Sequence, residues 1–234
     1  MSEALRWYCY RDAGEVAVQA RLRIQDAAQQ AIAARGRFSI VLAGGTTPEQ
    51  VYRGLKDFDT DWSRWFVWFG DERCLPADHP ERNSVMAQQA WLAHVPIPVK
   101  QVFPIPAELG PQCAADSYEK LITPERPFDL VLLGIGEDGH TASLFPGHAV
   151  PDDRLVIPVF NAPKPPPERV SLTFRALGDT RAICVLVTGA AKRDAVRRWK
   201  QGVDIPVSRL TCPTGVDVLL DEAACGGTGY LGSE

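Results

Sequence analysis

Residues 128–147 read FDLVLLGIGEDGHTASLFPG, a short apolar run followed by a glycine-rich turn that carries ionisable side chains. The run over residues 128–133 follows Pro127 and ends at a glycine, which is typical of a parallel strand that is buried on both faces. In an open α/β sheet, ligands bind in the crevice formed by the loops that follow the carboxyl ends of the strands. We therefore expect a functional site in residues 134–147.

The turn combines glycines with side chains that can take part in acid–base chemistry. The glycines permit close backbone approach, and Glu137, Asp138, His140 and Thr141 lie between or just after them. Two interpretations are open at this point. The turn either forms a site, or it is a polar turn in which Asp138 and Thr141 only cap the next helix.

Strand and helix patterns alternate on both sides of this stretch. Residues 13–35 carry apolar residues at intervals of three and four and are followed by Gly36, which predicts an amphipathic helix with a glycine stop. Strands are expected near residues 38–42, 62–69, 101–103, 128–133, 155–159, 169–174, 182–187 and 210–220, and further helices near 48–55, 83–92, 111–121 and 188–199. We therefore expect an α/β fold with a mostly parallel central sheet covered by helices on both faces, in a single domain over residues 1–234.

Composition and charge exclude several classes of protein. The chain is 45% hydrophobic and 23% charged, with a formal net charge of -4 and no long run of either sign. Nucleic acid is therefore not an expected partner. The first residues lack the features of a signal peptide, and no apolar segment approaches the ~20 residues needed to span a bilayer. We expect a cytoplasmic protein with no membrane association.

The cysteines predict neither a metal site nor a disulfide framework. The 6 cysteines are scattered, with no C-x-x-C pair and no Cys/His spacing that suits zinc. We expect reduced thiols that pack as small apolar residues. Cys74 is the exception to watch because it follows a charged motif, although no histidine is placed to act as its base.

A candidate phosphate site follows the strand expected at 38–42. Residues 43–48 read AGGTTP and lead into a helical pattern, with Thr46 or Thr47 as a possible cap and Pro48 near the first turn. The free N–H groups and the positive dipole end of such a helix favour an anion. The motif matches neither nucleotide-binding glycine loop, so it favours a phosphate ester. An ordinary tight turn between strand and helix is the alternative.

Charged residues also lie at other expected strand ends. Asp71, Glu72 and Arg73 follow the aromatic strand at 62–69, and they form either part of a site or a solvated loop. Lys192 lies in the first turn of a helix, where a cation opposes the helix dipole unless an anion compensates it. That placement favours a second phosphate contact.

Taken together, the motifs AGGTTP, FGDER, ERNS, LGIGEDGHTASLFPG, RVSLTF and TGAAK occur in this order along nearly the whole chain. This set resembles the lactonase branch of the glucosamine-6-phosphate isomerase/6-phosphogluconolactonase family. The resemblance implies a Rossmann-like α/β sandwich that hydrolyses 6-phospho-D-glucono-1,5-lactone in the oxidative pentose phosphate pathway. It implies a small-molecule phosphosugar lactone as the partner and no metal or organic cofactor, and we expect a monomer.

The resemblance also implies catalytic roles. His140 matches the family's catalytic histidine, and Asp138 matches the acid that orients it. A histidine with a pKa near ~6.5 can remove a proton from water as that water attacks the lactone carbonyl. The resulting oxyanion needs hydrogen-bond donors, for which Arg73 or loop N–H groups are candidates.

The remaining matched positions concern the phosphate group. The residues expected to bind it are Gly44, Gly45, Thr46, Thr47, Arg169 and Lys192. Asp71 and Asn83 match motif positions whose roles here are open. The chain departs from the family pattern at Thr46, where serine is usual, and at Arg82, which precedes Asn83 in place of a serine.

Two other functions remain as alternatives. The sister activity, glucosamine-6-phosphate deaminase, shares the GEDGH core but supplies a second carboxylate shortly after the histidine, and residues 141–146 contain no acid. The chain could also be a sugar-phosphate sensor that binds without turnover. The length leaves little room for a further module, and the pair of Asp138 and His140 favours catalysis.

Overall fold

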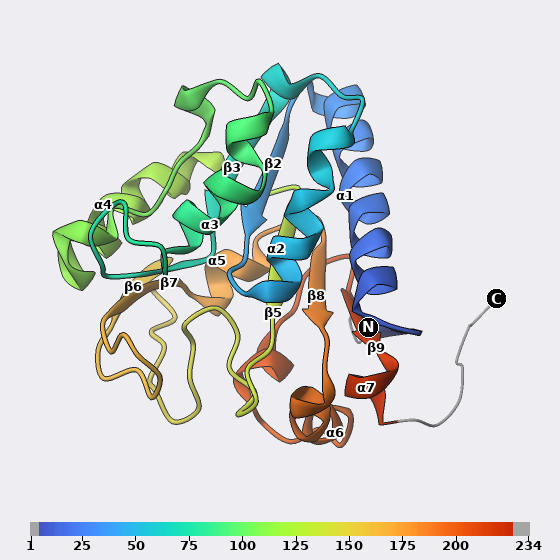
Figure 1. The fold of residues 1–234 in the computed structure, drawn as a ribbon. Coiled ribbons are helices and arrows are strands. Elements are labelled where there is room, and N and C mark those ends of the chain that lie inside the picture. The colour runs from blue at the N-terminus through green and yellow to red at the C-terminus, as the bar shows by residue number, and fades with distance from the viewer. Residues whose placement is uncertain (1–4, 227–234) are drawn as a thin grey trace.

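The computed structural model describes residues 5–226, and its centre is a parallel sheet with the strand order β1-β9-β8-β5-β2-β3 (Figure 1). These strands are β1 (Leu5–Tyr10), β2 (Phe38–Leu42), β3 (Trp65–Phe69), β5 (Leu130–Gly134), β8 (Ile183–Val187) and β9 (Val216–Asp221). Every neighbouring pair is parallel, so the loops that follow the strands gather at one edge of the sheet, toward the bottom of Figure 1. The expected α/β class with a mostly parallel central sheet is confirmed.

Helices flank this sheet. The α-helices are α1 (Ala13–Arg35), α2 (Thr46–Arg53), α3 (Asn83–Ala90), α4 (Pro111–Ile122), α5 (Phe174–Gly178), α6 (Arg193–Lys200) and α7 (Glu222–Cys225). α1 begins after Asp12, whose side chain accepts the Glu15 N–H at 2.9 Å, and it ends at Gly36 with a φ of 72°. α1 packs against β2, β8 and β9, and α2 packs against β5 and β8.

A second, antiparallel sheet lies beside the first, and the sequence did not predict it. Its strands are β4 (Asp71–Arg73), β7 (Arg169–Leu172) and β6 (Val156–Val159), in the order β4-β7-β6. Gly70 joins the two sheets, because its N–H donates to Leu42 of β2 at 2.9 Å and its carbonyl accepts the Leu172 N–H at 2.8 Å. The interpretation of residues 71–73 as a solvated loop was therefore wrong.

Several expected boundaries also differ. β1 was not expected from the sequence; it is a half-buried edge strand that pairs with β9 along its whole length. The strand expected at 101–103 is a single bridge between Val67 and Val102 after a 3-10 turn. β7 is shorter than expected because the Thr173 side chain caps α5, and the helix expected from residue 188 begins with a 3-10 turn, Ala190–Lys192.

One continuous hydrophobic cluster joins both sheets. Its largest fully buried side chains include Trp65, Trp68, Trp91, Tyr52 and Tyr118. Within residues 5–226, no helix combines the length and the apolar character that a membrane crossing needs.

Candidate active site

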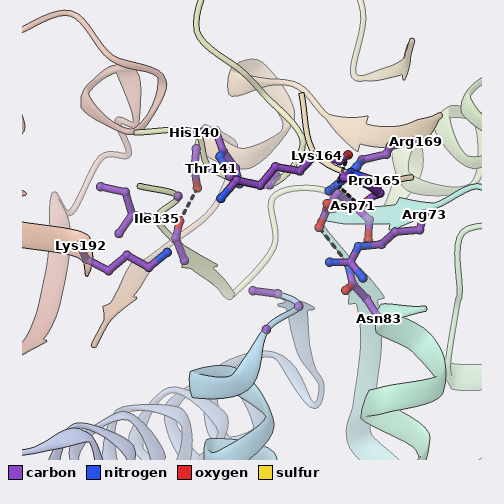
Figure 2. Close-up of a pocket in the computed structure, with 16 residues that line it drawn as sticks. Asp71, Arg73, Asn83, Ile135, His140, Thr141, Lys164, Pro165, Arg169 and Lys192 are labelled. Atoms are coloured by element: carbon purple, nitrogen blue, oxygen red, sulfur yellow. Dashed lines mark hydrogen bonds between the residues drawn. The ribbon is translucent and has the colours of Figure 1, made fainter. Parts of the chain in front are cut away.

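A cavity of about 290 Å³ lies beside the carboxyl ends of β2 and β5 and is bordered by β4 and β7 (Figure 2). Its lining residues are Ala43, Gly44, Gly45, Asp71, Arg73, Asn83, Gly134, Ile135, Gly136, His140, Thr141, Ala142, Lys164, Pro165, Arg169 and Lys192. Most of the site residues expected from the sequence therefore meet at one place. Of the others, Asp138 contacts His140, whereas Thr46 and Thr47 do not line the cavity.

The turn before His140 holds its imidazole ring in place. Nδ1 of His140 lies 2.5 Å from Oδ1 of Asp138, and the His140 backbone N–H donates to the same oxygen at 3.1 Å. The His140 carbonyl accepts the Gly136 N–H at 2.7 Å. A Cβ on Gly136 would lie 2.0 Å from Nδ1 of His140, so only glycine leaves room for the ring.

The burial of His140 favours a neutral imidazole that can act as a base. Burial lowers the pKa of His140 below its ordinary value, and the nearby Asp138 and Asp71 carboxylates offset this only in part. Burial alone would raise the pKa of Asp138, but hydrogen bonds from His140 and its charge bring it below the usual value. An ionised carboxylate only accepts hydrogen bonds, so Nδ1 of His140 carries the proton and Nε2 is free to accept one.

The capping interpretation of this turn was wrong. The Thr141 hydroxyl donates to the Gly134 carbonyl at 2.9 Å, and the Asp138 carboxylate is used by His140. Residues 135–150 contain turns and a single bridge but no helix that these side chains could cap.

Asp71 and Asn83 form a buried polar network on the β4 side of the cavity. The Asn83 amide donates to the Asp71 carbonyl at 2.9 Å and to Oδ1 of Asp71 at 3.0 Å, while the Ser143 hydroxyl donates to Oδ2 at 2.6 Å. A Cβ on Gly44 would lie 1.9 Å from Oδ1 of Asn83. Asn83 therefore connects the glycine turn after β2 with Asp71. This contact gives a structural role to the asparagine of the ERNS motif.

Glu72 is fully buried and caps α3. Its two carboxylate oxygens accept the N–H groups of Asn83 at 2.7 Å and of Ser84 at 2.9 Å, the free donors of the first helical turn. Nε of Arg82 lies 3.5 Å from this carboxylate, and the same side chain pairs with Glu108 at 2.7 Å. Arg82, the departure from the family pattern, therefore supports the helix that presents Asn83 and does not line the cavity.

The glycine turn after β2 leaves its helix start open. α2 begins at Thr46 with Gly45 as its N-cap at a φ of 105°, and no side chain caps it, so the expected threonine cap is wrong. The Thr47 hydroxyl instead bonds the Thr188 hydroxyl at 2.6 Å. The N–H groups of the first turn remain available to an anion, as at other helix N-termini.

Two arginines border the cavity from the small sheet. Arg73 and Arg169 are direct partners in the β4–β7 ladder, an arrangement of like charges that is unfavourable without an anion between them. Burial lowers the pKa of Arg169, although the Asp71 charge raises it. Within the described part of the chain, Nε of Arg73 is buried without a hydrogen-bond partner.

Lys164 lines the cavity and Ser143 binds Asp71 at its wall, and neither residue was expected from the sequence. Lys164 belongs to the proline-rich segment between β6 and β7, where composition predicts only an extended loop. Ser143 follows Ala142, whose φ of 47° is unusual for a residue with a side chain and turns the chain toward Asp71.

Cys74 does not line the cavity, and burial raises its pKa to about 11, so a catalytic thiol is disfavoured.

Comparison with known proteins matches residues 11–219 to the family described as glucosamine-6-phosphate isomerases/6-phosphogluconolactonase. A 6-phosphogluconolactonase of Mycobacterium leprae is 39% identical, over 86% of this chain and 90% of the relative. One of Streptomyces coelicolor is also 39% identical, over 96% of this chain and 95% of the relative.

Solved structures agree with this comparison. The 6-phosphogluconolactonase of Thermotoga maritima has a TM-score of 0.87 and 26% identity, and the match covers 93% of this chain and 100% of that chain. A monomeric glucosamine-6-phosphate deaminase has a TM-score of 0.83 at 21% identity, over 94% of this chain and 99% of that chain, a likeness of fold alone. The matched residues and the identity to these relatives show that this chain belongs to the glucosamine-6-phosphate isomerase/6-phosphogluconolactonase family.

Proposed function

We propose that this chain hydrolyses 6-phospho-D-glucono-1,5-lactone to 6-phospho-D-gluconate, a step of the oxidative pentose phosphate pathway. The relatives at 39% identity over most of the chain carry the name 6-phosphogluconolactonase, which supports this reaction. The observation that carries the proposal is the pairing of His140 Nδ1 with Asp138 at 2.5 Å, at the wall of a cavity that also carries cations.

Ester hydrolysis uses the paired side chains in sequence. Nε2 of His140 removes a proton from water while the water oxygen bonds to the lactone carbonyl carbon. Asp138 holds the ring and favours the imidazolium that forms, because its ionised carboxylate accepts from Nδ1. The tetrahedral intermediate then releases the ring oxygen, which takes the proton back from His140. Arg73 and loop N–H groups are candidates to stabilise the oxyanion.

The phosphate group of the substrate needs donors and positive charge at the other end of the molecule. We assign it to the N–H groups of the turn from Gly44 to Thr47, with Arg169 and Lys192 as the cations. Burial lowers the pKa of Lys192, and the charge of Glu137 raises it only in part. A bound phosphate would stabilise the charged form of this half-buried lysine. Thr46 and Thr47 would contribute through their backbone, since they do not line the cavity.

Turnover of freshly generated 6-phosphogluconolactone, followed as proton release against the spontaneous rate, tests the proposal. We expect fast hydrolysis of the phosphorylated lactone, and His140→Ala should lower kcat by about 10²- to 10⁴-fold while the far-UV circular dichroism stays unchanged. Near-normal turnover by a folded His140→Ala variant would overturn the assignment of the base.

Parallel substrates separate the two alternative functions. Ammonia release from glucosamine 6-phosphate would indicate a deaminase, and binding of 6-phosphogluconate without any turnover would indicate a sensor. Unphosphorylated gluconolactone serves as the control for the phosphate site, because its hydrolysis should be far slower if the cations bind phosphate.

We further propose that the protein is a cytoplasmic monomer that acts on this small molecule without a nucleic-acid partner. The absence of a charged run in the sequence supports the last point. Light scattering coupled to gel filtration tests the state of assembly, and a mass close to 25.7 kDa is the expected result.

A further inference from the structure

Lys164 is a cation of the cavity wall that the proposed reaction leaves without a role. It lies between β6 and β7 and lines the cavity together with His140 and Lys192. Figure 2 shows its side chain extending across the cavity from the Arg169 side toward His140. Among residues 5–226, no hydrogen-bond or ion-pair partner is found for its ammonium group.

Hydrogen bonds from Arg169 hold the backbone at Lys164 in place. The Arg169 guanidinium donates to the carbonyls of Lys164 at 2.9 Å, of Pro165 at 3.0 Å and of Pro166 at 3.1 Å. Arg169 itself is buried, and the consecutive prolines restrict the backbone of the segment. The backbone that carries the lysine is therefore held in place before a ligand binds, so binding does not cost the conformational entropy of ordering this segment.

The charge of Lys164 acts on the proposed base and on the lysine assigned to the phosphate. It lowers the pKa of His140 and the pKa of Lys192, which places the ammonium group within electrostatic reach of both side chains. The other charged groups that face His140 are Asp138 on its own turn and Asp71 on β4, and both raise its pKa. Lys164 is thus a cation of the cavity wall that opposes the effect of these two carboxylates on His140.

Arg73, the candidate suggested by the sequence, has a different environment. One of its terminal nitrogens donates to the Glu81 carbonyl, and its charge acts on Arg169, its partner across the β4–β7 ladder. These contacts direct Arg73 toward the end of the cavity formed by the small sheet. The reacting carbonyl must lie beside His140, because the attacking water has to reach both.

We propose that Lys164 binds the negative charge that develops on the lactone carbonyl oxygen during attack by water, a role that rests on the proposed function. As the water oxygen bonds to the carbonyl carbon, the π electrons of the carbonyl move onto its oxygen and the proton passes to His140. The Lys164 ammonium donates to this oxyanion. When the intermediate collapses, the carbonyl reforms, the ring C–O bond breaks and His140 returns the proton to the ring oxygen. Water is the only co-reactant.

The test compares Lys164→Met and Lys164→Arg with the wild-type protein. A Lys100→Met variant, at an exposed lysine on a 3-10 turn outside the cavity wall, serves as the matched control. We expect Lys164→Met to lower kcat by about 10²-fold, with KM and the affinity for 6-phosphogluconate changed by less than about threefold. Lys164→Arg should recover most of kcat, and Lys100→Met should match the wild type.

A pH profile supplies a readout that a purely structural role would not change. Because Lys164 lowers the pKa of His140, its removal should move the acid limb of kcat/KM toward higher pH. Unchanged kcat in a folded Lys164→Met variant would overturn the role, and so would a rise in KM alone, which would place Lys164 on the phosphate. Absence of turnover by the wild-type protein would refute the proposed function itself.

Discussion

Replacing Gly44 by alanine should damage the site through Asn83. The added Cβ would lie 1.9 Å from Oδ1 and 2.5 Å from Cγ of Asn83, where real contacts do not fall below 3.0 Å. The amide must therefore shift by at least 1.1 Å, the difference between 3.0 and 1.9. Such a shift breaks its hydrogen bonds to the Asp71 carbonyl at 2.9 Å and to the Asp71 carboxylate at 3.0 Å.

The magnitude follows from these two bonds. One neutral bond contributes about 1 kcal/mol and one bond to a charged group about 1.5–3 kcal/mol, so Gly44→Ala should lower the free energy of unfolding by about 2.5–4 kcal/mol. For a chain of this size, that loss corresponds to a Tm lower by roughly 5–16 °C. Thermal unfolding followed by circular dichroism measures it.

A double-mutant cycle identifies the cause. If Asn83 is the obstacle, Gly44→Ala combined with Asn83→Ala should lose less stability than the sum of the single variants, by about 0.5–3 kcal/mol. Gly134→Ala is the matched control, because a Cβ there would meet its nearest atom at 3.9 Å, an ordinary contact. Additive losses, or a Gly44→Ala variant as stable as the wild type, would refute the reasoning.

Three further predictions concern charge. Asp138→Asn removes a carboxylate that raises the pKa of His140, so the acid limb of kcat/KM should move to lower pH while kcat falls; a limb at higher pH would contradict this. Glu72→Gln should lower the free energy of unfolding by about 3 kcal/mol, because it weakens the cap of α3 and leaves the charge of Arg82 less compensated; unchanged thermal unfolding would count against it. Lys192→Ala should raise KM for the phosphorylated lactone at least about tenfold, with a smaller effect on kcat. Steady-state kinetics measure both constants, and an unchanged KM would show that Lys192 does not bind the phosphate.

Features fixed by neighbouring residues could be predicted from the sequence. The helix Ala13–Arg35 has its stop at Gly36, and the turn from Gly136 to His140 requires its glycine through a contact four residues away. In both cases the deciding interactions join residues that are a few positions apart in the sequence. Periodicity and glycine placement report on such interactions directly.

Features fixed by distant residues could not be predicted in this way. β4 is a strand because Asp71 pairs with Ser171, a residue far away in the sequence. Ser143 is a site residue only because the fold brings Asp71 beside it. Charged and hydroxyl side chains in short polar stretches look alike in sequence, whether tertiary pairing buries them or solvent surrounds them.

The pairing of β1 with β9 has a consequence for synthesis on the ribosome. Leu5 lies opposite Val216, and β9 sits between β1 and β8, so the first strand made has no place in the sheet until the last has emerged. After β8 has been made and until β9 emerges, the nascent chain therefore exposes the open edge of β8, a surface that can pair with other strands. A chain interrupted between residues 192 and 216 should be degraded or bound by chaperones, even though every residue lining the cavity has already been made.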